Sequence, residues 1–329
     1  MKEPFQALVL DPTQSLPVSV QPITLDQLPA GDVLIKVVYS SVNYKDALAC
    51  QPNGKIVRAY PFIPGIDLAG YVVTSTDDRF HEGQAVLATG YDIGVSHFGG
   101  FSQYVRLPSK WIVPLPEQLS LREAMIYGTA GFTAALSIQR LEENGVQPPT
   151  GKVLVTGATG GVGGTAIAML HKLGYDVVAS TGKQAATSYL HSLGAQEIIS
   201  REAVVEHAEK SLNKQLWQAA IDPVGGTTLA SILSKLTYGG SVAVSGLTGG
   251  SAVATTVMPF ILRGVNLLGI DSVFVSYDVR AKLWERMATD MKPAILDLLV
   301  DREISLIDLP QATEDILHSQ TQGRIIVRL

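Results

Sequence analysis

A glycine-rich turn at residues 157–163 carries the clearest binding chemistry in this chain. Gly160 leaves the space that a pyrophosphate needs, and Gly163 lets a following helix pack closely on its strand. Free N–H groups at the start of that helix attract an anion. Alanine stands at position 158, where the usual dinucleotide-binding fingerprint has its first glycine. The candidate cofactor contacts in this turn are Thr159, Gly160, Gly161 and Val162.

The residues after the next strand-like run indicate which dinucleotide binds. An NAD site usually places Asp or Glu there to hold the ribose 2′-hydroxyl. This chain has Ser180, Thr181, Gly182 and Lys183 instead, and Arg201 offers a second cation. Hydroxyls and cations suit a 2′-phosphate. We therefore predict NADPH as the cofactor, against the alternative that both cations are solvated surface charges.

Three further candidate cofactor contacts follow later strand-like runs. They are Gly246, Leu247 and Ser272. Ligands of α/β proteins bind outside the carboxyl ends of parallel strands, and Gly246 would let the backbone come near a nicotinamide. Ordinary turn chemistry is the competing interpretation for each residue.

The elements around these residues predict an α/β fold with a doubly wound parallel sheet. The β-type run 153–156 precedes the glycine turn, and a helical pattern follows that Gly174 would end. Strand-like and helical runs then alternate to about residue 270, which implies helices on both faces of the sheet. The later predicted strands are 175–179, 197–200, 216–221, 241–245 and 265–270, and the predicted helices are 184–193, 203–212, 227–236, 278–291 and 294–300.

The first 122 residues indicate a separate, mostly β domain. Strand-like runs at 6–10, 32–39, 68–74 and 84–89 are separated by Pro and Gly clusters. A helical pattern over 121–139 carries the chain onward, and the tail 323–329 is strand-like again. We predict domains at 1–122, joined by 295–329, and at 123–294.

Composition limits the classes of function. At 329 residues the chain can bury two cores, and its 46% hydrophobic content argues against disorder. A net charge of −5 gives no electrostatic case for binding nucleic acid or an anionic membrane, and no apolar run could span a bilayer. One cysteine, Cys50, excludes an internal disulfide, so a cytoplasmic location is expected.

Several short stretches together resemble the medium-chain dehydrogenase/reductase superfamily. They are residues 40–46 (SSVNYKD), 63–70 (IPGIDLAG), 128–134 (GTAGFTA), the glycine turn and 322–324 (QGR). Residues 43–48, 97–100, 220–225 and 255–263 resemble the quinone-oxidoreductase-like branch, closest to NADPH-dependent acryloyl-CoA reductases. The resemblance runs the length of the chain. It implies a GroES-like β domain and a Rossmann domain, and a homodimer formed at the outer edge of the sheet near residues 260–270.

The chain departs from the zinc alcohol dehydrogenases of that superfamily. Asn43 and Tyr44 stand where the pattern has cysteine and histidine, and Ile66 with Asp67 replaces a His-Glu pair. The 6 histidines show no pair at ligand spacing. We therefore predict no metal. Without a Lewis acid, hydride transfer to an activated alkene is easier than alcohol oxidation.

Tyr44 and Asn43 are the candidate catalytic residues. The resemblance implies that Tyr44 contacts the cofactor, and its phenol could also deliver a proton. Asn43 could donate to an enolate oxygen, and a turn-forming role is the alternative. Lys45 and Arg58 could meet the phosphates of a CoA ester, or could be solvated surface cations.

The expected function is NADPH-dependent reduction of a short α,β-unsaturated acyl-CoA, with acryloyl-CoA as the specific substrate. An NADPH:quinone reductase is the first alternative, because it needs only a different pocket. A non-catalytic nucleotide-binding protein is the second, and the acidic balance weakens an RNA-linked version of it. Fold alone does not choose among the three.

Overall fold

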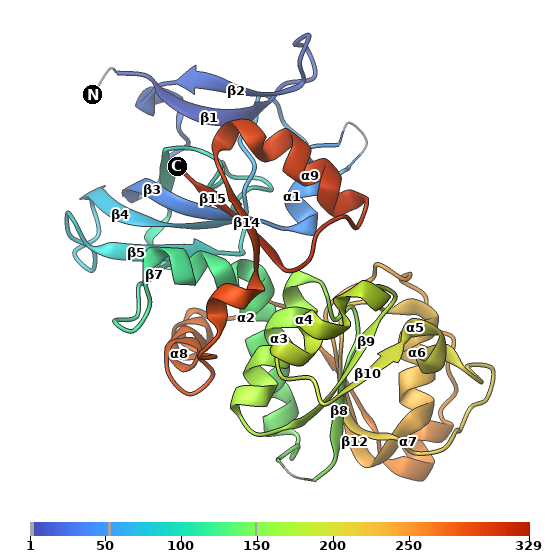
Figure 1. The fold of residues 1–329 in the computed structure, drawn as a ribbon. Helices are drawn as coiled ribbons and strands as arrows, with labels where there is room; N and C mark the ends of the chain where they lie inside the picture. Colours follow the sequence, from blue (N-terminus) through green and yellow to red (C-terminus); the bar gives the residue numbers. More distant parts are fainter. Residues whose placement is uncertain (1–2, 52–53, 149) are drawn as a thin grey trace. The chain divides into compact units, whose positions relative to one another are not determined.

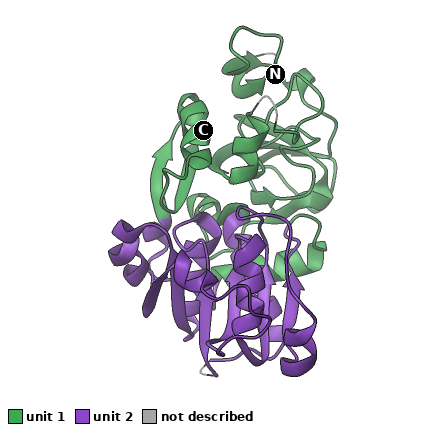
Figure 2. Cartoon of the chain, turned by 90° about the vertical axis from the view of Figure 1, so that its right-hand side faces the viewer, with its two compact units in different colours: residues 1–129, 273–288, 300–329 green, residues 130–272, 289–299 purple. Residues whose placement is uncertain are grey.

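β-branched runs in the two parts of the chain form two different kinds of sheet. The computed structural model describes residues 3–51, 54–148 and 150–329. These divide into two units (Figure 2): unit 1 is residues 1–129, 273–288 and 300–329, and unit 2 is residues 130–272 and 289–299. Each unit is described by itself below.

Unit 1 contains a seven-stranded sheet to which the end of the chain contributes (Figure 1). Its order is β14-β15-β3-β4-β5-β7, with β6 paired to β3. The strands are β3 (Val33–Val42), β4 (Asp67–Ser75), β5 (Ala85–Thr89), β6 (Tyr104–Leu107), β7 (Ile112–Pro114), β14 (Val300–Ile304) and β15 (Arg324–Arg328). Because β15 is antiparallel to β3, with Ile325 opposite Val42, residue 324 lies near the end of β3.

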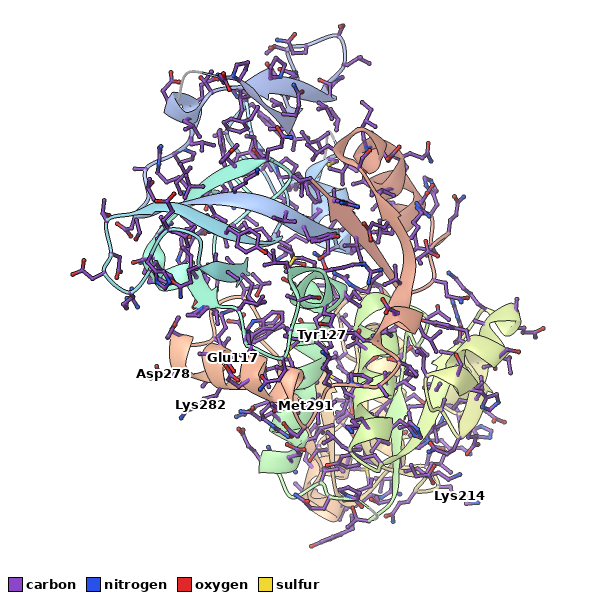
Figure 3. The ribbon with its side chains drawn as sticks, turned by 60° about the vertical axis from the view of Figure 1, so that its left-hand side comes forward. Glu117, Tyr127, Lys214, Asp278, Lys282 and Met291 are labelled. Atoms are coloured by element: carbon purple, nitrogen blue, oxygen red, sulfur yellow. The ribbon has the colours of Figure 1, made fainter. Side chains whose placement is uncertain are left out.

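The helices of unit 1 and a β-hairpin surround this sheet. The hairpin pairs β1 (Phe5–Leu10) with β2 (Val18–Ile23). The helices are α1 (Tyr44–Ala49), α8 (Tyr277–Ala288), α9 (Leu309–Leu317) and the first turns of α2 (Leu121–Glu143). Tyr127 of α2 lies beside α8, and its hydroxyl donates to the Met287 carbonyl over 3.0 Å (Figure 3).

Unit 2 is a parallel sheet of the order β10-β9-β8-β11-β12-β13, the doubly wound arrangement of dinucleotide-binding domains. The strands are β8 (Lys152–Val155), β9 (Asp176–Thr181), β10 (Glu197–Ser200), β11 (Trp217–Asp222), β12 (Leu236–Val244) and β13 (Asn266–Gly269). The helices are α3 (Gly161–Lys172), α4 (Thr187–Ser192), α5 (Arg201–Val205), α6 (Gly226–Lys235) and α7 (Met258–Arg263). Leu154, Val178 and Val242 are buried in the core of this sheet, as the apolar runs predict.

The fold class predicted from sequence is confirmed, and individual elements differ. Gly174 ends α3 at φ 83°, as predicted. Residues 294–300, predicted as a helix, form a short 3₁₀ helix at Leu296–Leu299 and the start of β14. The predicted helix 203–212 is only the five residues of α5.

Several elements were absent from the sequence prediction, among them β2, β7, α1 and α9. The first part of the segment 260–270, which was expected at the outer edge of the sheet, belongs to the helix α7. Pro259 suits the first turn of this helix, and Gly264 ends it at φ 59°. The described unit boundaries also differ from the predicted domains: residues 123–129 and 273–288 belong to unit 1, and residues 295–299 to unit 2.

Candidate functional site

The corner between β3 and α1 in unit 1 presents Tyr44. Asn43 is extended, at φ −122° and ψ 161°, and is the N-cap of α1. Its backbone N–H donates to the Asp46 carboxylate over 2.9 Å, which fixes the first turn of the helix. Tyr44, the first helical residue, is 47% exposed. The corner therefore offers the phenol to a ligand, whereas Asn43 and Asp46 beside it are buried.

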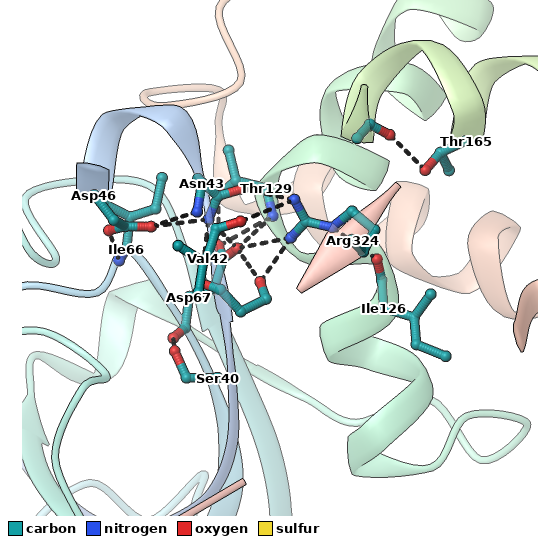
Figure 4. A network of polar contacts seen from close by, with 12 residues as sticks. Ser40, Val42, Asn43, Asp46, Ile66, Asp67, Ile126, Thr129, Thr165 and Arg324 are labelled. Atoms are coloured by element: carbon teal, nitrogen blue, oxygen red, sulfur yellow. Dashed lines mark hydrogen bonds and ion pairs between the residues drawn. The ribbon is translucent and has the colours of Figure 1, made fainter. Parts of the chain in front are cut away.

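Asp67, at the start of β4, is the centre of a buried network below this corner (Figure 4). Its carboxylate accepts hydrogen bonds from the Ser41 hydroxyl and the Asn43 amide, each over 2.7 Å. The Thr129 N–H also donates to it, over 2.9 Å, as does the Thr129 hydroxyl. A fully buried carboxylate needs such partners, because an unpaired one would lose its hydration without compensation.

Arg324 supplies the positive charge of this network (Figure 4). Its Nη2 lies 3.7 Å from Asp67 Oδ2 and donates to the Ser41 hydroxyl over 2.7 Å. Its Nη1 donates to the Asn43 side-chain oxygen over 3.1 Å, and its Nε to the Ile126 carbonyl over 3.0 Å. The guanidinium is 3% exposed. One residue from the last strand thus connects β3, α1 and α2.

Gly128 interrupts α2 and leaves the space that the network needs beside this helix. Its backbone, at φ 50° and ψ −155°, interrupts the helix and turns the Thr129 N–H toward Asp67. A Cβ at this position would lie 2.4 Å from Asp67 Oδ2 and 2.5 Å from Ser41 Oγ. Glycine is therefore required by both the left-handed backbone and the close approach of the carboxylate.

Asp46 is a second buried carboxylate in the same corner. One oxygen accepts from the Ile66 N–H over 2.9 Å, and the other from the Asn43 N–H and amide. Burial, with the nearby negative charge of Asp67, raises the pKa of Asp46 to about 7. Its contacts hold α1 to the β4 start, so its role here is positional.

This donor set does not fit a zinc ion. The Asn43 amide already donates to both carboxylates, Asp67 faces a guanidinium, and Ile66 offers no ligand atom. Within residues 3–51, 54–148 and 150–329, no group of three or more His, Cys, Asp or Glu side chains is arranged to hold a metal ion. The predicted donation from Asn43 to a substrate oxygen stays a prediction, and the amide's present partners favour a structural role.

The glycine turn of unit 2 forms the start of α3, as predicted. Gly160 is the N-cap, Gly161 and Val162 are the first helical residues, and Thr159 is buried just before them. The first N–H groups of an α-helix have no acceptor within the helix. They are therefore available to an anion at the carboxyl end of β8.

The predicted 2′-phosphate residues come together at the end of β9. Thr181 is its last residue, and the Thr181 hydroxyl accepts from the Lys183 N–H over 3.0 Å. Arg201 begins α5, after the neighbouring strand β10. Its guanidinium lies directly over Gly182, where an added Cβ would be 2.3 Å from Nη2 and 2.4 Å from Nε. Glycine is thus needed at position 182 for Arg201 to lie across the strand end.

Two of the predicted cofactor contacts lie just after the end of β12. Gly246 and Leu247 follow this strand, and Leu247 is 67% exposed. Ser245 Oγ is buried there and has no hydrogen-bond partner within the described part of the chain. A bound polar group would satisfy this hydroxyl. Ser272 lies after β13, and the Thr133 hydroxyl donates to its hydroxyl over 2.8 Å.

Sequence reasoning did not predict the buried hydrogen-bonding roles of three residues that organise these sites. Asp67 was noted only within the motif 63–70 and in the comparison with the zinc-ligand pattern, and Arg324 only within the motif 322–324. Charged residues are seldom buried unless they are paired, so a charge within an apolar run is the signal that could have found them. Asp222, at the end of β11, accepts from the N–H groups of Val224 and Gly225 and from the Thr156 hydroxyl. Burial raises the pKa of Asp222. It fixes the turn beside the glycine-rich loop.

No helix among the described residues is long and apolar enough to cross a membrane.

Two family models match different parts of this chain. Residues 29–117 match a family model described as alcohol dehydrogenase GroES-like domain, and residues 161–289 match one described as zinc-binding dehydrogenase. A Bacillus subtilis protein provisionally named quinone oxidoreductase YhfP is 60% identical over 99% of both chains. The Ruegeria pomeroyi acrylyl-CoA reductase AcuI is 47% identical over 98% of both chains.

Two solved structures extend the comparison. The crystal structure of Bacillus subtilis YhfP with NAD bound has a TM-score of 0.97, at 60% identity over 99% of both chains. Escherichia coli K-12 YhdH with bound NADPH has a TM-score of 0.94, at 48% identity over 98% of this chain and 99% of that one. With relatives this similar over their whole length, this chain belongs to the medium-chain dehydrogenase/reductase superfamily of oxidoreductases.

Proposed function

We propose that this enzyme uses NADPH to reduce the carbon–carbon double bond of a short α,β-unsaturated acyl-CoA, converting acryloyl-CoA to propanoyl-CoA. The observation that carries the proposal is the buried corner of unit 1. There Asn43 and Asp67 stand at positions where the zinc alcohol dehydrogenase pattern has other residues, and they form a buried hydrogen-bonded network with Arg324. The similarity to the acrylyl-CoA reductase AcuI supports the acceptor.

The cofactor preference rests on the strand end at residues 180–183. No carboxylate is present there to hold a ribose 2′-hydroxyl, and the Arg201 guanidinium lies over Gly182. Arginine recognises phosphate through paired, charge-assisted hydrogen bonds. The E. coli relative contains NADPH, whereas YhfP was crystallised with NAD. We therefore assign NADPH to this chain.

The residues of this chain have defined tasks in that reaction. When bound, NADPH supplies the hydride that adds to the β-carbon of the alkene. Negative charge then develops on the thioester oxygen of the substrate, and the α-carbon takes up a proton. Tyr44, exposed at the start of α1, is the proposed cofactor contact and proton source. The buried network holds that turn in place, so that the phenol needs little reorganisation during the reaction.

A quinone is the second candidate acceptor. The name of the 60% identical relative YhfP favours it. A quinone also accepts a hydride without a metal, and its reduced oxygen would use the same Tyr44 donor. The two proposals differ only in the pocket that receives the acceptor.

The test compares acceptors directly. NADPH oxidation is followed with acryloyl-CoA, crotonyl-CoA and 1,4-benzoquinone under identical conditions, with the propanoyl-CoA product identified by mass. Acryloyl-CoA turnover with a kcat/KM far above the other two supports the first proposal. Quinone as the one good acceptor moves the function to the second. NADPH binding without turnover of any of them refutes both and leaves a non-catalytic nucleotide-binding role.

We also propose a homodimer formed through the outer edge of the unit 2 sheet. β13 is the last strand in the sheet order, and Leu267 on it is 42% exposed. Ile261 and Leu262 of α7 are 72% and 53% exposed beside it. An uncovered apolar edge of this kind favours pairing with a second copy.

A further inference from the structure

A pocket in unit 1 lies outside the corner network and the glycine turn. Its volume is about 520 Å³. Three cationic side chains line it, those of Lys45, Lys55 and Arg58. The rest of the lining is apolar apart from Ser96: Pro29, Ile56, Ala59, Pro61, Phe62, Val95 and Phe98.

The charges of this pocket are not balanced by the protein. No Asp or Glu is among its lining residues. Within the described ranges, none of the three cationic side chains forms an ion pair or hydrogen bond with another residue. Three like charges around one cavity repel one another, and a bound anion would remove that repulsion. The cluster is positive, whereas the net charge of the whole chain is −5.

The backbone of the pocket wall is also unusual. Lys55 has a φ of 55°, the left-handed region that residues other than glycine seldom adopt. Such strain concentrates at ligand clamps, where the surrounding structure holds it. Lys55 and Arg58 both line this cavity.

The apolar part of the pocket suits a flat heterocycle. Phe62 and Phe98 pack edge to face with ring centroids 5.5 Å apart, and Phe62 is buried. Ile56 and Pro29 add aliphatic surface to the lining. A cavity with an apolar wall and three cations matches an adenine joined to several phosphates. CoA ends in such a group, an adenosine with a 3′-phosphate and a 5′-diphosphate.

We infer that this pocket binds the 3′-phosphoadenosine diphosphate end of the acyl-CoA substrate, with Lys45, Lys55 and Arg58 as the phosphate ligands. The inference rests on the proposed acyl-CoA reductase function. Lys45 follows Tyr44 directly in α1. The same helical turn therefore carries the proposed proton source and one wall of the nucleotide pocket, and the pantetheine arm of the substrate would connect them.

A comparison of substrates tests the pocket in the complete enzyme. Acryloyl-CoA is compared with acryloyl-pantetheine, which has the reacting thioester and no nucleotide, for the parent and the double variant Lys55→Ala/Arg58→Ala. The expected result is that KM for acryloyl-CoA rises about tenfold or more in the variant, while kcat and the kinetics with acryloyl-pantetheine stay within about twofold. Lys110→Ala is the matched control, since this lysine of unit 1 lies outside the pocket lining.

A binding measurement separates this inference from the proposed function. Adenosine 3′,5′-bisphosphate is titrated by calorimetry into enzyme saturated with NADP⁺, so that the unit 2 site is already filled. Binding by the parent, with Kd weakened about tenfold or more in the double variant, supports the pocket even where acryloyl-CoA is not reduced. No binding by the parent, or equal changes of KM for acryloyl-CoA and acryloyl-pantetheine in the variant, overturns the assignment.

Discussion

Replacing Arg201 by methionine tests how the chain recognises the 2′-phosphate of its cofactor. The substitution keeps an unbranched, flexible side chain and removes the guanidinium with its charge. A hydrogen bond between charged partners contributes about 1.5–3 kcal/mol, which corresponds to about 10–150-fold in Kd. We expect the Kd of NADPH to rise within that range. NADH has no 2′-phosphate, so its Kd should change by less than about twofold.

The contact between Arg201 and Gly182 provides a second variant from the same geometry. In Gly182→Ala the new Cβ would lie 2.3 Å from Arg201 Nη2. The guanidinium is at the end of a flexible side chain, so it would move away and the strand would stay in place. Gly182→Ala should therefore reproduce much of the loss seen in Arg201→Met, and combining the two should add little.

The assay is the quenching or enhancement of NADPH fluorescence on titration with enzyme, together with the ratio of kcat/KM for NADPH and NADH. Arg140→Met is the matched control, because that guanidinium pairs with Glu143 on the exposed face of α2. Equal weakening of NADPH and NADH by Arg201→Met would show that the residue supports the fold of the site. An unchanged NADPH/NADH ratio would refute the assignment.

Three further predictions concern the corner network and the sheet edge. Arg324→Met leaves buried Asp67 without its cation, so urea unfolding should show a loss of about 3–5 kcal/mol, and a loss below 1 kcal/mol would contradict the network's importance. The raised pKa of Asp46, about 7, means that the folded state keeps this proton to higher pH than the unfolded state, in which it leaves near pH 4. The contribution of this shifted pKa to stability is therefore complete below about pH 4 and is lost as pH rises to about 7. The free energy of unfolding of the parent minus that of Asp46→Asn should fall across this window. A difference that does not change with pH would exclude the raised pKa. Light scattering should give a dimer for the parent and a monomer for Ile261→Asp, whereas a monomeric parent would exclude the proposed edge interface.

Local signals in the sequence were sufficient for the glycine turn of unit 2. Its strand, turn and helix are contiguous, and glycine, β-branched and helix-forming residues each act within a few positions of themselves. The glycine turn before α3 and Gly174 as the end of that helix followed from these short-range rules. The same rules misjudged residues 294–300, because pairing of Val300 with the distant Arg324 in β15 favoured a strand there.

Residue types within short segments were enough to identify the superfamily, the parallel sheet, the loss of the zinc-ligand residues and the candidate cofactor contacts. The tertiary structure alone decided how Asp67, Arg324 and Gly128 form one buried network, and how Lys45, Lys55 and Arg58 line one pocket. These contacts join parts of the chain that no local pattern relates. Asp67 and Arg324 are brought together only because β15 returns to pair with β3, and the cost of burying a charge then requires that they meet.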